Sequence, residues 1–496
     1  MKLTRRTLLG SSLVAGASLV TKQVAAQPAA APPHSHVPPA APAPAPADPP
    51  PHAHTPPAAP APADPFSHPH MPPAAPAPAD PPPHVHTPPA DAAPSPAAPI
   101  APAGAAAQPG VPGHRVVVPN GSLLPWTVHR GVKIFHLRAQ PIRHQIAPGL
   151  DIEAWGYNGV SPGPVIEAVA GDHVRVYVTN ELPEHTSIHW HGILVPYGMD
   201  GVAGLTQEAI APGKTFRYEF TFDRAGTFMY HPHADEMTQI ALGMMGIIVV
   251  HPRAAEPRRV RDYALMTHEW KIPIGARRAD PLAMNDFNVL TFNGKAFPAT
   301  APLVAEIGDL IRIRLANLGP MDHHPIHIHG HTFELVATDG GPIPAAARIP
   351  ETTVLVPVGT TRTLELVARQ PGDWPLHCHM THHAMNQMGH DSANLVGADV
   401  RGLDSQLGRI VPNTMVMGTT GMGDMAGMRM TQPNNSITML GGQGPHGTID
   451  MGGMFTVIKI RDHLRGDADP GWYEPPTSAI ALEATADELA RDGIKL

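Results

Sequence analysis

Short stretches of alternating polar and apolar residues fill the chain from about residue 114 to 463, and this alternation is the strongest constraint on its fold. The stretches are rich in β-branched and aromatic residues, as at 173–179, 215–222, 311–315 and 363–367. Turn residues separate them, for example at 161–164. The pattern predicts antiparallel β-sandwiches, and about 350 residues suffice for two such domains.

We expect the first sandwich over 114–253 and the second over 254–463, because a charged stretch begins shortly after Pro252. The second sandwich carries an insertion at about 389–453. A tail follows at 464–496, with one short helix-like segment.

The first 26 residues are typical of an export signal. Arg5 and Arg6 precede a short apolar stretch that ends near Ala26, and this pattern resembles a twin-arginine signal peptide. The stretch is shorter than the roughly 20 residues that a membrane-spanning helix needs, and no later stretch is long enough. We therefore expect a periplasmic or secreted protein without a membrane span.

Residues 27–113 consist mostly of proline and alanine and lack the large apolar residues that a core needs, which predicts a disordered Pro/Ala/His-rich spacer. This spacer contains four His-x-His pairs: His34/His36, His52/His54, His68/His70 and His84/His86. The pairs are either drift within a repeat or a low-affinity copper-gathering tail, since neutral imidazoles bind Cu(II) well.

The charge argues against a nucleic-acid-binding protein, and the cysteine count excludes a fold held by an internal disulfide. The formal charge is −8 without a basic stripe of the kind that phosphate backbones require, so we expect no nucleic-acid partner. Cys378 is the only cysteine, so an internal disulfide is impossible. A lone cysteine can be an ordinary buried apolar residue, but both sequence neighbours of Cys378 are histidines, which favours a metal ligand.

We single out four His-x-His pairs in the sandwich region, one of which encloses Cys378. They are His189/His191, His231/His233, His327/His329 and His377/His379. Side chains at positions i and i+2 of a strand leave the same face about 7 Å apart, which suits neighbouring ions of a cluster better than one ion. The pairs thus offer eight imidazoles to a multinuclear site.

The same geometry separates Cys378 from the cluster. If His377 and His379 face the cluster, Cys378 points to the opposite side of the strand and binds a different metal. A thiolate, two imidazoles and a distant thioether form the ligand set of a blue-copper electron-transfer centre. Cys378, His324 and His383 supply the first three ligands, and Met388 fits the axial position. Structural zinc prefers closed sites with several cysteines, so this composition favours copper.

The motifs HWHG, HPH, HPIHIHGH and HCHMTHHAMNQM, in this order, resemble the copper-binding motifs of the multicopper oxidases, that is, laccases and metallo-oxidases. The resemblance extends from about residue 158 to 459. It implies an all-β chain with two cupredoxin-like Greek-key β-sandwich domains. It also implies an enzyme that takes single electrons from a reductant and reduces dioxygen to water. The implied cofactor is copper, in type 1, type 2 and binuclear type 3 sites, with four ions per functional unit.

The resemblance also implies roles for individual residues. The type 1 ligands would be His324, Cys378, His383 and Met388. The type 2 ligands would be His189 and His327. The type 3 ligands would be His191, His231, His233, His329, His377 and His379.

Two positions bear on proton delivery. The family often has an acid just before the second type 1 histidine, and this chain has His382 there. Asp200 resembles the family's acid near the type 2 copper and would relay protons to reduced oxygen. Alternatively, Asp200 is only the aspartate of a turn before Gly201.

Only 91 positions separate His233 from His324, which leaves no room for a further sandwich between them. This spacing indicates the two-domain type, which resembles laccases whose cluster lies between domain one of one subunit and domain two of the next. Such head-to-tail contacts must close into a ring or continue as a polymer, and we expect a homotrimer.

The insertion contains methionines separated mostly by glycine, threonine and aspartate: Met415, Met417, Met422, Met425, Met428, Met430, Met439 and Met451. Because thioethers favour Cu(I), the segment would capture Cu(I), or else it forms a lid over an organic-substrate cleft. The reductant is thus Cu(I), Mn(II) or a phenolic compound.

Three rival classes stay open, namely a copper-sequestering or copper-resistance protein without turnover, a copper nitrite reductase and a simple electron carrier. The HCH motif and the eight cluster positions favour the oxidase.

Overall fold

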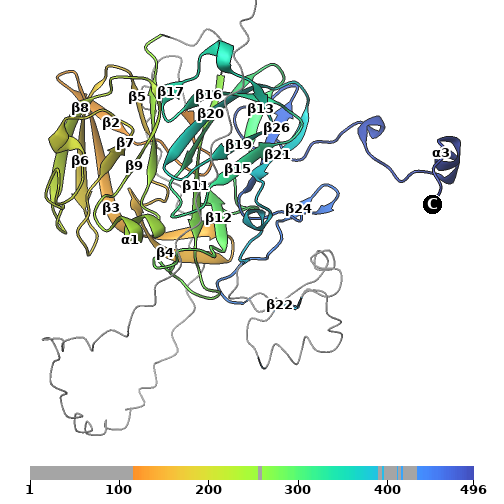
Figure 1. The fold of residues 1–496 in the computed structure, drawn as a ribbon, viewed down its shortest axis with the longest axis horizontal. Coiled ribbons are helices and arrows are strands. Elements are labelled where there is room, and N and C mark those ends of the chain that lie inside the picture. The colour runs from red at the N-terminus through yellow and green to blue at the C-terminus, as the bar shows by residue number, and fades with distance from the viewer. Residues whose placement is uncertain (1–115, 255–259, 389–393, 396–409, 411–414, 417–432) are drawn as a thin grey trace, which may run out of the picture. The chain divides into compact units, whose positions relative to one another are not determined.

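The computed structural model describes residues 116–254, 260–388, 394–395, 410, 415–416 and 433–496. Within these residues the regular structure is almost all strand, which confirms the predicted all-β class (Figure 1). The expected signal, the spacer and most of the methionine-rich insertion lie outside the described residues.

The first sandwich is built from a five-stranded and a four-stranded sheet. The five-stranded sheet has the order β2-β3-β6-β8 with β4 paired to β3, and the four-stranded sheet has the order β5-β10-β9-β7. Side chains of both sheets share one core, to which β6 contributes Val174, Val176 and Val178, the alternate residues of the predicted strand. The strand bounds are β2 (Trp126–His129), β3 (Val132–Ala147), β4 (Leu150–Tyr157), β5 (Ile166–Val169), β6 (His173–Asn180), β7 (His189–His191), β8 (Thr215–Thr221), β9 (Gly226–His231) and β10 (Gly246–His251).

The second sandwich pairs an eight-stranded with a five-stranded sheet around a second core. The larger sheet has the order β1-β11-β14-β20-β16-β17, with β12 on β11 and β18 on β16, and the smaller has the order β13-β26-β21-β15-β19. The bounds are β1 (Val116–Val117), β11 (Val260–Trp270), β12 (Val289–Phe292), β13 (Leu303–Glu306), β14 (Leu310–Asn317), β15 (His324–Ile328), β16 (Phe333–Thr338), β17 (Gly341–Pro342), β18 (Pro350–Glu351), β19 (Thr353–Val356), β20 (Thr360–Val367), β21 (Gly372–Cys378) and β26 (Phe455–Arg461).

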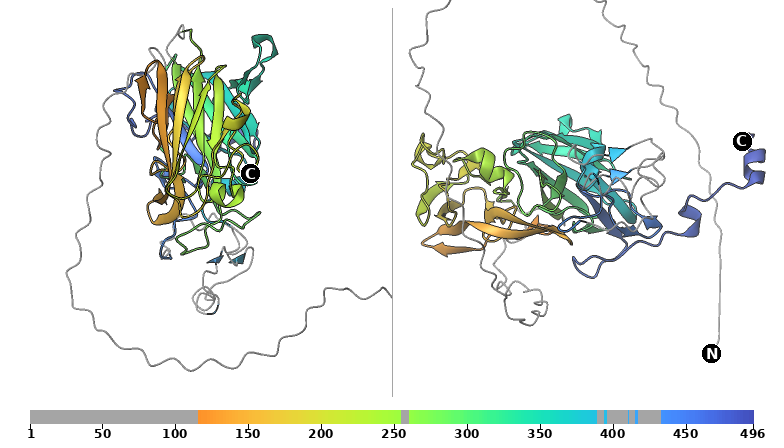
Figure 2. Two further views of the ribbon diagram at one scale, coloured as in Figure 1. Left: turned by 90° about the vertical axis from the view of Figure 1, so that its left-hand side faces the viewer. Right: turned by 90° about the horizontal axis from the view of Figure 1, so that it is seen from below.

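A third core joins the two sandwiches, which lie side by side in Figure 2. On β10, Ile248 and Val250 face the first core, whereas Ile247 and Val249 face the third core together with Met266 of β11. Both faces of β10 are therefore covered, which explains why all of its residues are apolar or buried. The short strand β1 pairs in parallel with β11, so the start of the described chain belongs to a sheet of the second sandwich.

The remaining elements are short. The helices are η1 (Tyr197–Met199), α1 (Glu236–Ala241), η2 (Ala345–Ala347), η3 (Thr381–Ala384), η5 (Thr477–Ala479) and α3 (Ala486–Arg491). Two small ladders pair β22 (Asn394–Leu395) with β23 (Met415–Val416) and β24 (Gln443–Gly444) with β25 (Gly447–Thr448). No helix among the described residues has the length and apolar character needed to cross a membrane.

Candidate metal sites

Four histidines of the first sandwich gather at the edge of its four-stranded sheet, and we call them the first histidine group: His189, His191, His231 and His233. The antiparallel pairing of β7 with β9 places His189 directly opposite His231. Between the histidines of β7, Trp190 points into the core, where it packs against Tyr218 and Phe220. The alternation of the strand therefore sends both imidazoles of β7 away from the core.

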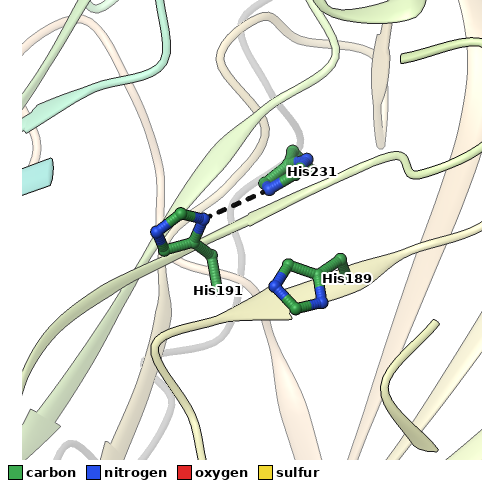
Figure 3. A group of neighbouring side chains, drawn as sticks. All are labelled: His189, His191 and His231. Atoms are coloured by element: carbon green, nitrogen blue, oxygen red, sulfur yellow. Dashed lines mark hydrogen bonds between the residues drawn. The ribbon is translucent and has the colours of Figure 1, made fainter. Parts of the chain in front are cut away.

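The rings of the first group lie close enough to share metal ions. The ring centroid of His189 lies 5.8 Å from that of His191 and 5.3 Å from that of His231. His191 Nδ1 approaches His231 Nε2 at 3.4 Å (Figure 3). One ring nitrogen from each of these three residues lies within 4.8 Å of the other two. The first two motifs therefore lie together in the structure.

The second sandwich repeats the arrangement with β15 and β21, and we call its members the second histidine group: His327, His329, His377 and His379. His327 lies directly opposite His377 across the ladder, as His189 lies opposite His231 in the first group. The ring centroids of His327 and His329 are 4.8 Å apart, and His329 Nε2 lies 3.1 Å from His377 Nε2.

Cys378 points to the other side of β21, as the alternation predicts. Its Sγ lies 3.8 Å from His324 Nδ1 and 3.5 Å from His383 Nδ1, and all three side chains are buried. These residues form the thiol site. Because His377 and His379 flank Cys378 in sequence, the thiol site and the second histidine group are connected by one peptide bond on either side of the cysteine.

The backbone around η3 brings His383 to the thiol site. Cys378 N donates to Met454 O at 3.0 Å, and Met454 N donates to His383 O at 2.9 Å, so the start of β26 joins the two ligand positions. Gly453 adopts φ +59°, and a Cβ atom there would lie 2.4 Å from the same carbonyl of His383. Met388, the expected axial ligand, is half-buried at the end of this described segment.

In four of the eight histidines the Nδ1 atom is hydrogen-bonded to a main-chain carbonyl. His189 Nδ1 donates to Asp200 O at 2.8 Å, His231 Nδ1 to Pro232 O at 2.9 Å and His377 Nδ1 to Cys378 O at 2.9 Å. A hydrogen on Nδ1 leaves the lone pair on Nε2, which is the arrangement that a metal-ligating imidazole needs. The same holds for His327, whose Nδ1 donates to Thr352 O at 2.8 Å.

Burial keeps these ligand candidates uncharged. Burial lowers the pKa of His324 and His231 to about 3 and that of His377 to about 4, so all three imidazoles are neutral at pH 7. Burial also raises the pKa of the Cys378 thiol to about 12. A thiolate at this position therefore requires a neighbouring cation, which a metal ion provides.

Four acidic residues lie beside the candidate ligands, and only Asp200 was singled out from the sequence. Its Oδ1 lies 3.4 Å from His189 Nδ1. Glu236 of α1 reaches His231 Nδ1 at 3.3 Å, and Asp322 Oδ2 lies 3.5 Å from His383 Nε2. Glu269 lies beside His324 at the thiol site. Asp322 could have been noticed beside the HPIHIHGH motif, whereas Glu269 has no comparable local signal, because its strand also contains other charged and polar residues.

The two histidine groups line different cavities. The first group lines a cavity of about 740 Å³ together with Glu236 and loop residues of the second sandwich, including Met321. His327 and His329 line a separate, open pocket with His331. Among the described residues, no ring contact joins an imidazole of the first group to one of the second.

Several further histidines near the motifs are not assigned as ligands. His185, His323 and His382 are exposed. His331 is buried, and its ring packs against Trp374. His390 lies outside the described residues.

The donor sets suit copper. The thiol site combines one sulfur with two imidazoles, which is the composition of blue-copper centres. In the second group, His377 Nδ1 donates to Cys378 O, so its Nε2 offers a lone pair on the side of His329 Nε2, 3.1 Å away, and these two imidazoles could hold a metal ion. All-β sandwiches that carry such ligands define a class of copper-binding redox proteins.

Comparisons with known proteins identify the family within that class. Two sequence models described as multicopper oxidase match residues 139–255 and 273–396. The chain is 31% identical over 308 residues to Laccase-2 of Botryotinia fuckeliana, covering 53% of this chain and 51% of that protein. It is 28% identical over 338 residues to Copper resistance protein A of Escherichia coli, covering 57% and 54%. The chain thus spans about half the length of these curated relatives.

A solved structure supports the same assignment. The multicopper oxidase mgLAC aligns with a TM-score of 0.51 and 27% identity, over 68% of this chain and 91% of that one. The chain belongs to the multicopper oxidase family. This family binds copper, and its laccases are oxidoreductases.

Proposed function

We propose that this protein is an oxidase that couples the one-electron oxidation of a small reductant to the four-electron reduction of dioxygen to water. The observation that carries the proposal is the position of Cys378, whose thiol and flanking imidazoles lie on opposite sides of β21. When bound, copper supplies one-electron redox chemistry at the thiol site and dioxygen reduction at the histidine groups.

The residues would divide these tasks as the family resemblance implies. His324, Cys378, His383 and Met388 would hold the type 1 copper, and His189 and His327 the type 2 copper. The type 3 pair would be held by His191, His231, His233, His329, His377 and His379. The buried thiol site excludes water, while the peptide bonds on either side of Cys378 give electrons a short covalent path to His377 and His379.

The cluster would form between subunits of a homotrimer. In one chain the two histidine groups line separate cavities, and His329 and His379 of the second group are exposed. An interface that joins the first group of one chain to the second group of the next is head-to-tail, and closure into a ring satisfies every such interface.

Asp200 would deliver protons to the dioxygen site. Its carbonyl oxygen holds the Nδ1 hydrogen of His189, and its carboxylate lies beside the same ring, with about a third of the side chain exposed to solvent. A carboxylate in this position can exchange protons with water and pass them to a ligand shell.

The reductant would be Cu(I), with Mn(II) or a phenol as alternatives, and the protein would work in the periplasm or outside the cell. The methionine-rich segment, the His-x-His spacer and the twin-arginine signal that suggest these points lie mostly outside the described residues. Deletion of 415–439 should abolish oxidation of Cu(I) and spare that of small phenols if the segment captures Cu(I).

One set of measurements on the copper-loaded protein tests the function. We expect oxygen uptake with Cu(I) or a phenol, four copper ions per functional unit and EPR signals of both type 1 and type 2 copper. Full copper loading without oxygen uptake would instead indicate a sequestering protein. A type 1 signal alone would indicate an electron carrier, and nitrite turnover with fewer copper ions would indicate a nitrite reductase.

A further inference from the structure

Glu269 is a carboxylic acid without solvent-exposed surface. It lies near the end of β11, where the neighbouring positions from Arg261 to Trp270 are also buried. A buried carboxyl group destabilises a fold unless its oxygens have hydrogen-bond partners, so both oxygen atoms of Glu269 need a partner.

One oxygen of Glu269 binds the loop that precedes His324. Oε1 accepts hydrogen bonds from the backbone N–H of Met321 and, at 2.7 Å, from that of Asp322. Gly319 in the same loop allows this approach, because a Cβ atom there would lie 3.0–3.1 Å from the carboxyl group. The loop and the carboxyl group therefore hold each other in place.

The other oxygen faces a ligand of the thiol site. Oε2 lies 3.6 Å from Nε2 of His324, and within the described part of the chain neither atom has a hydrogen-bond partner. His324 is itself fully buried, so no bulk water reaches the ring nitrogen. Two unpaired buried polar atoms that face each other at this distance are complementary if one carries a hydrogen and the other accepts it.

The chemistry of His324 decides which atom carries the hydrogen. Its Nδ1 points to Cys378 Sγ and to His383 Nδ1, so Nδ1 is the atom that offers a lone pair to a metal. A neutral imidazole that ligates through Nδ1 carries its hydrogen on Nε2 and needs an acceptor there. In the histidine groups main-chain carbonyls serve this purpose, whereas at His324 the available acceptor is Glu269.

We infer that Glu269 is a positioning residue of the thiol site, which accepts the Nε2 hydrogen of His324, orients the ring and lowers the reduction potential of the bound copper. This inference rests on the proposed function, because it requires type 1 copper at Cys378. Burial raises the pKa of the Glu269 carboxyl group to about 8, whereas a copper cation at the thiol site would favour its ionised form. A buried carboxylate next to a ligand stabilises the more highly charged oxidised ion over the reduced ion.

The test is the midpoint potential of the blue absorption band in an optical redox titration, with the EPR hyperfine splitting as a second readout. We expect Glu269→Gln to raise the potential and to weaken copper affinity at this site roughly 10-fold. Gly319→Ala keeps the charge but pushes the carboxyl group aside, and should raise the potential less. An unchanged potential in both variants would overturn the inference.

A matched control is Glu167→Gln. Glu167 is also a buried glutamate paired with a histidine, His251, at 2.8 Å, but that pair lies on β5 and β10 of the first sandwich, whereas the thiol site lies in the second sandwich. This substitution should leave the potential unchanged, and an equal shift in the control would also overturn the inference. If Glu269→Gln fails to fold, Glu269→Asp and Gly319→Ala carry the test. Absence of a blue band in the wild-type protein would refute the proposed function instead.

Discussion

The thiol site and the histidine groups differ in how complete one chain makes them. Cys378, His324 and His383 are buried together, and their donor atoms converge without help from another molecule. The histidine groups lie apart on the same chain, and the second group is largely open, with His329 and His379 exposed. Electron entry would therefore belong to the single chain, whereas dioxygen reduction would belong to the assembly.

The largest effect should come from removing the self-contained site. Cys378→Ser replaces the thiolate by a hydroxyl that binds copper weakly, so we expect loss of the blue absorption band and an oxygen-uptake rate lower by more than about 10³-fold. Copper bound to the histidine groups should persist in EPR and in copper counting. Retention of rapid oxygen uptake would show that electrons enter elsewhere.

Removing one imidazole from either histidine group should have the opposite spectroscopic outcome. In His231→Ala and His329→Ala we expect the blue band to remain, while oxygen uptake falls at least about 100-fold because cluster copper is lost. Copper counts and EPR measure the loss. A variant that lost the blue band as well would show that the two sites are not independent.

Asp200→Asn tests whether the carboxylate beside the first histidine group delivers protons. The amide retains the shape of the carboxylate but cannot take up a proton, so oxygen turnover should fall about 10-fold with normal copper content. Steady-state rates between pH 5 and 8 give the readout. An unchanged rate and an unchanged pH profile would leave Asp200 as an ordinary turn residue.

A smaller effect concerns the buried histidine His268 and the pH dependence of the free energy of unfolding. Burial lowers the pKa of His268 to about 3, so between about pH 6.5 and pH 3 the unfolded chain binds a proton that the folded chain does not. Stability is therefore lost as the pH falls through this range. Relative to pH 7, copper-free His268→Leu should lose about 3 kcal/mol less stability at pH 4 than the wild type. Urea unfolding at both pH values measures this difference, and equal losses would contradict it.

Much of the fold and most candidate ligands could be predicted from the sequence because their signals are local. Strand alternation predicted that Cys378 points away from its neighbouring histidines, and in the structure its Sγ lies beside His383 on the other side of the strand. The same alternation accounts for Trp190, which is buried between two histidines that point away from the core. His324 lies three positions before His327, so the same alternation turns it away from the second histidine group and towards the cysteine.

The rest depends on contacts between distant segments. Glu269 lies 55 positions before His324, and only the packing of β11 beside the loop 318–323 makes it a neighbour of the ring. The pairing of β1 with β11 across the two sandwiches gives no periodic signal in either segment. The separation of the histidine groups also depends on tertiary packing, since their motifs look equivalent in sequence.

The most direct test of this account mixes two inactive chains. Copper-loaded trimers assembled from equal amounts of His231→Ala and His329→Ala chains should recover about a quarter of the wild-type oxygen uptake. Random head-to-tail assembly joins an intact first group to an intact second group in about that share of interfaces. Native mass spectrometry confirms that mixed trimers form. Mixed trimers with no more oxygen uptake than the separate variants would contradict the claim that the cluster is shared between chains.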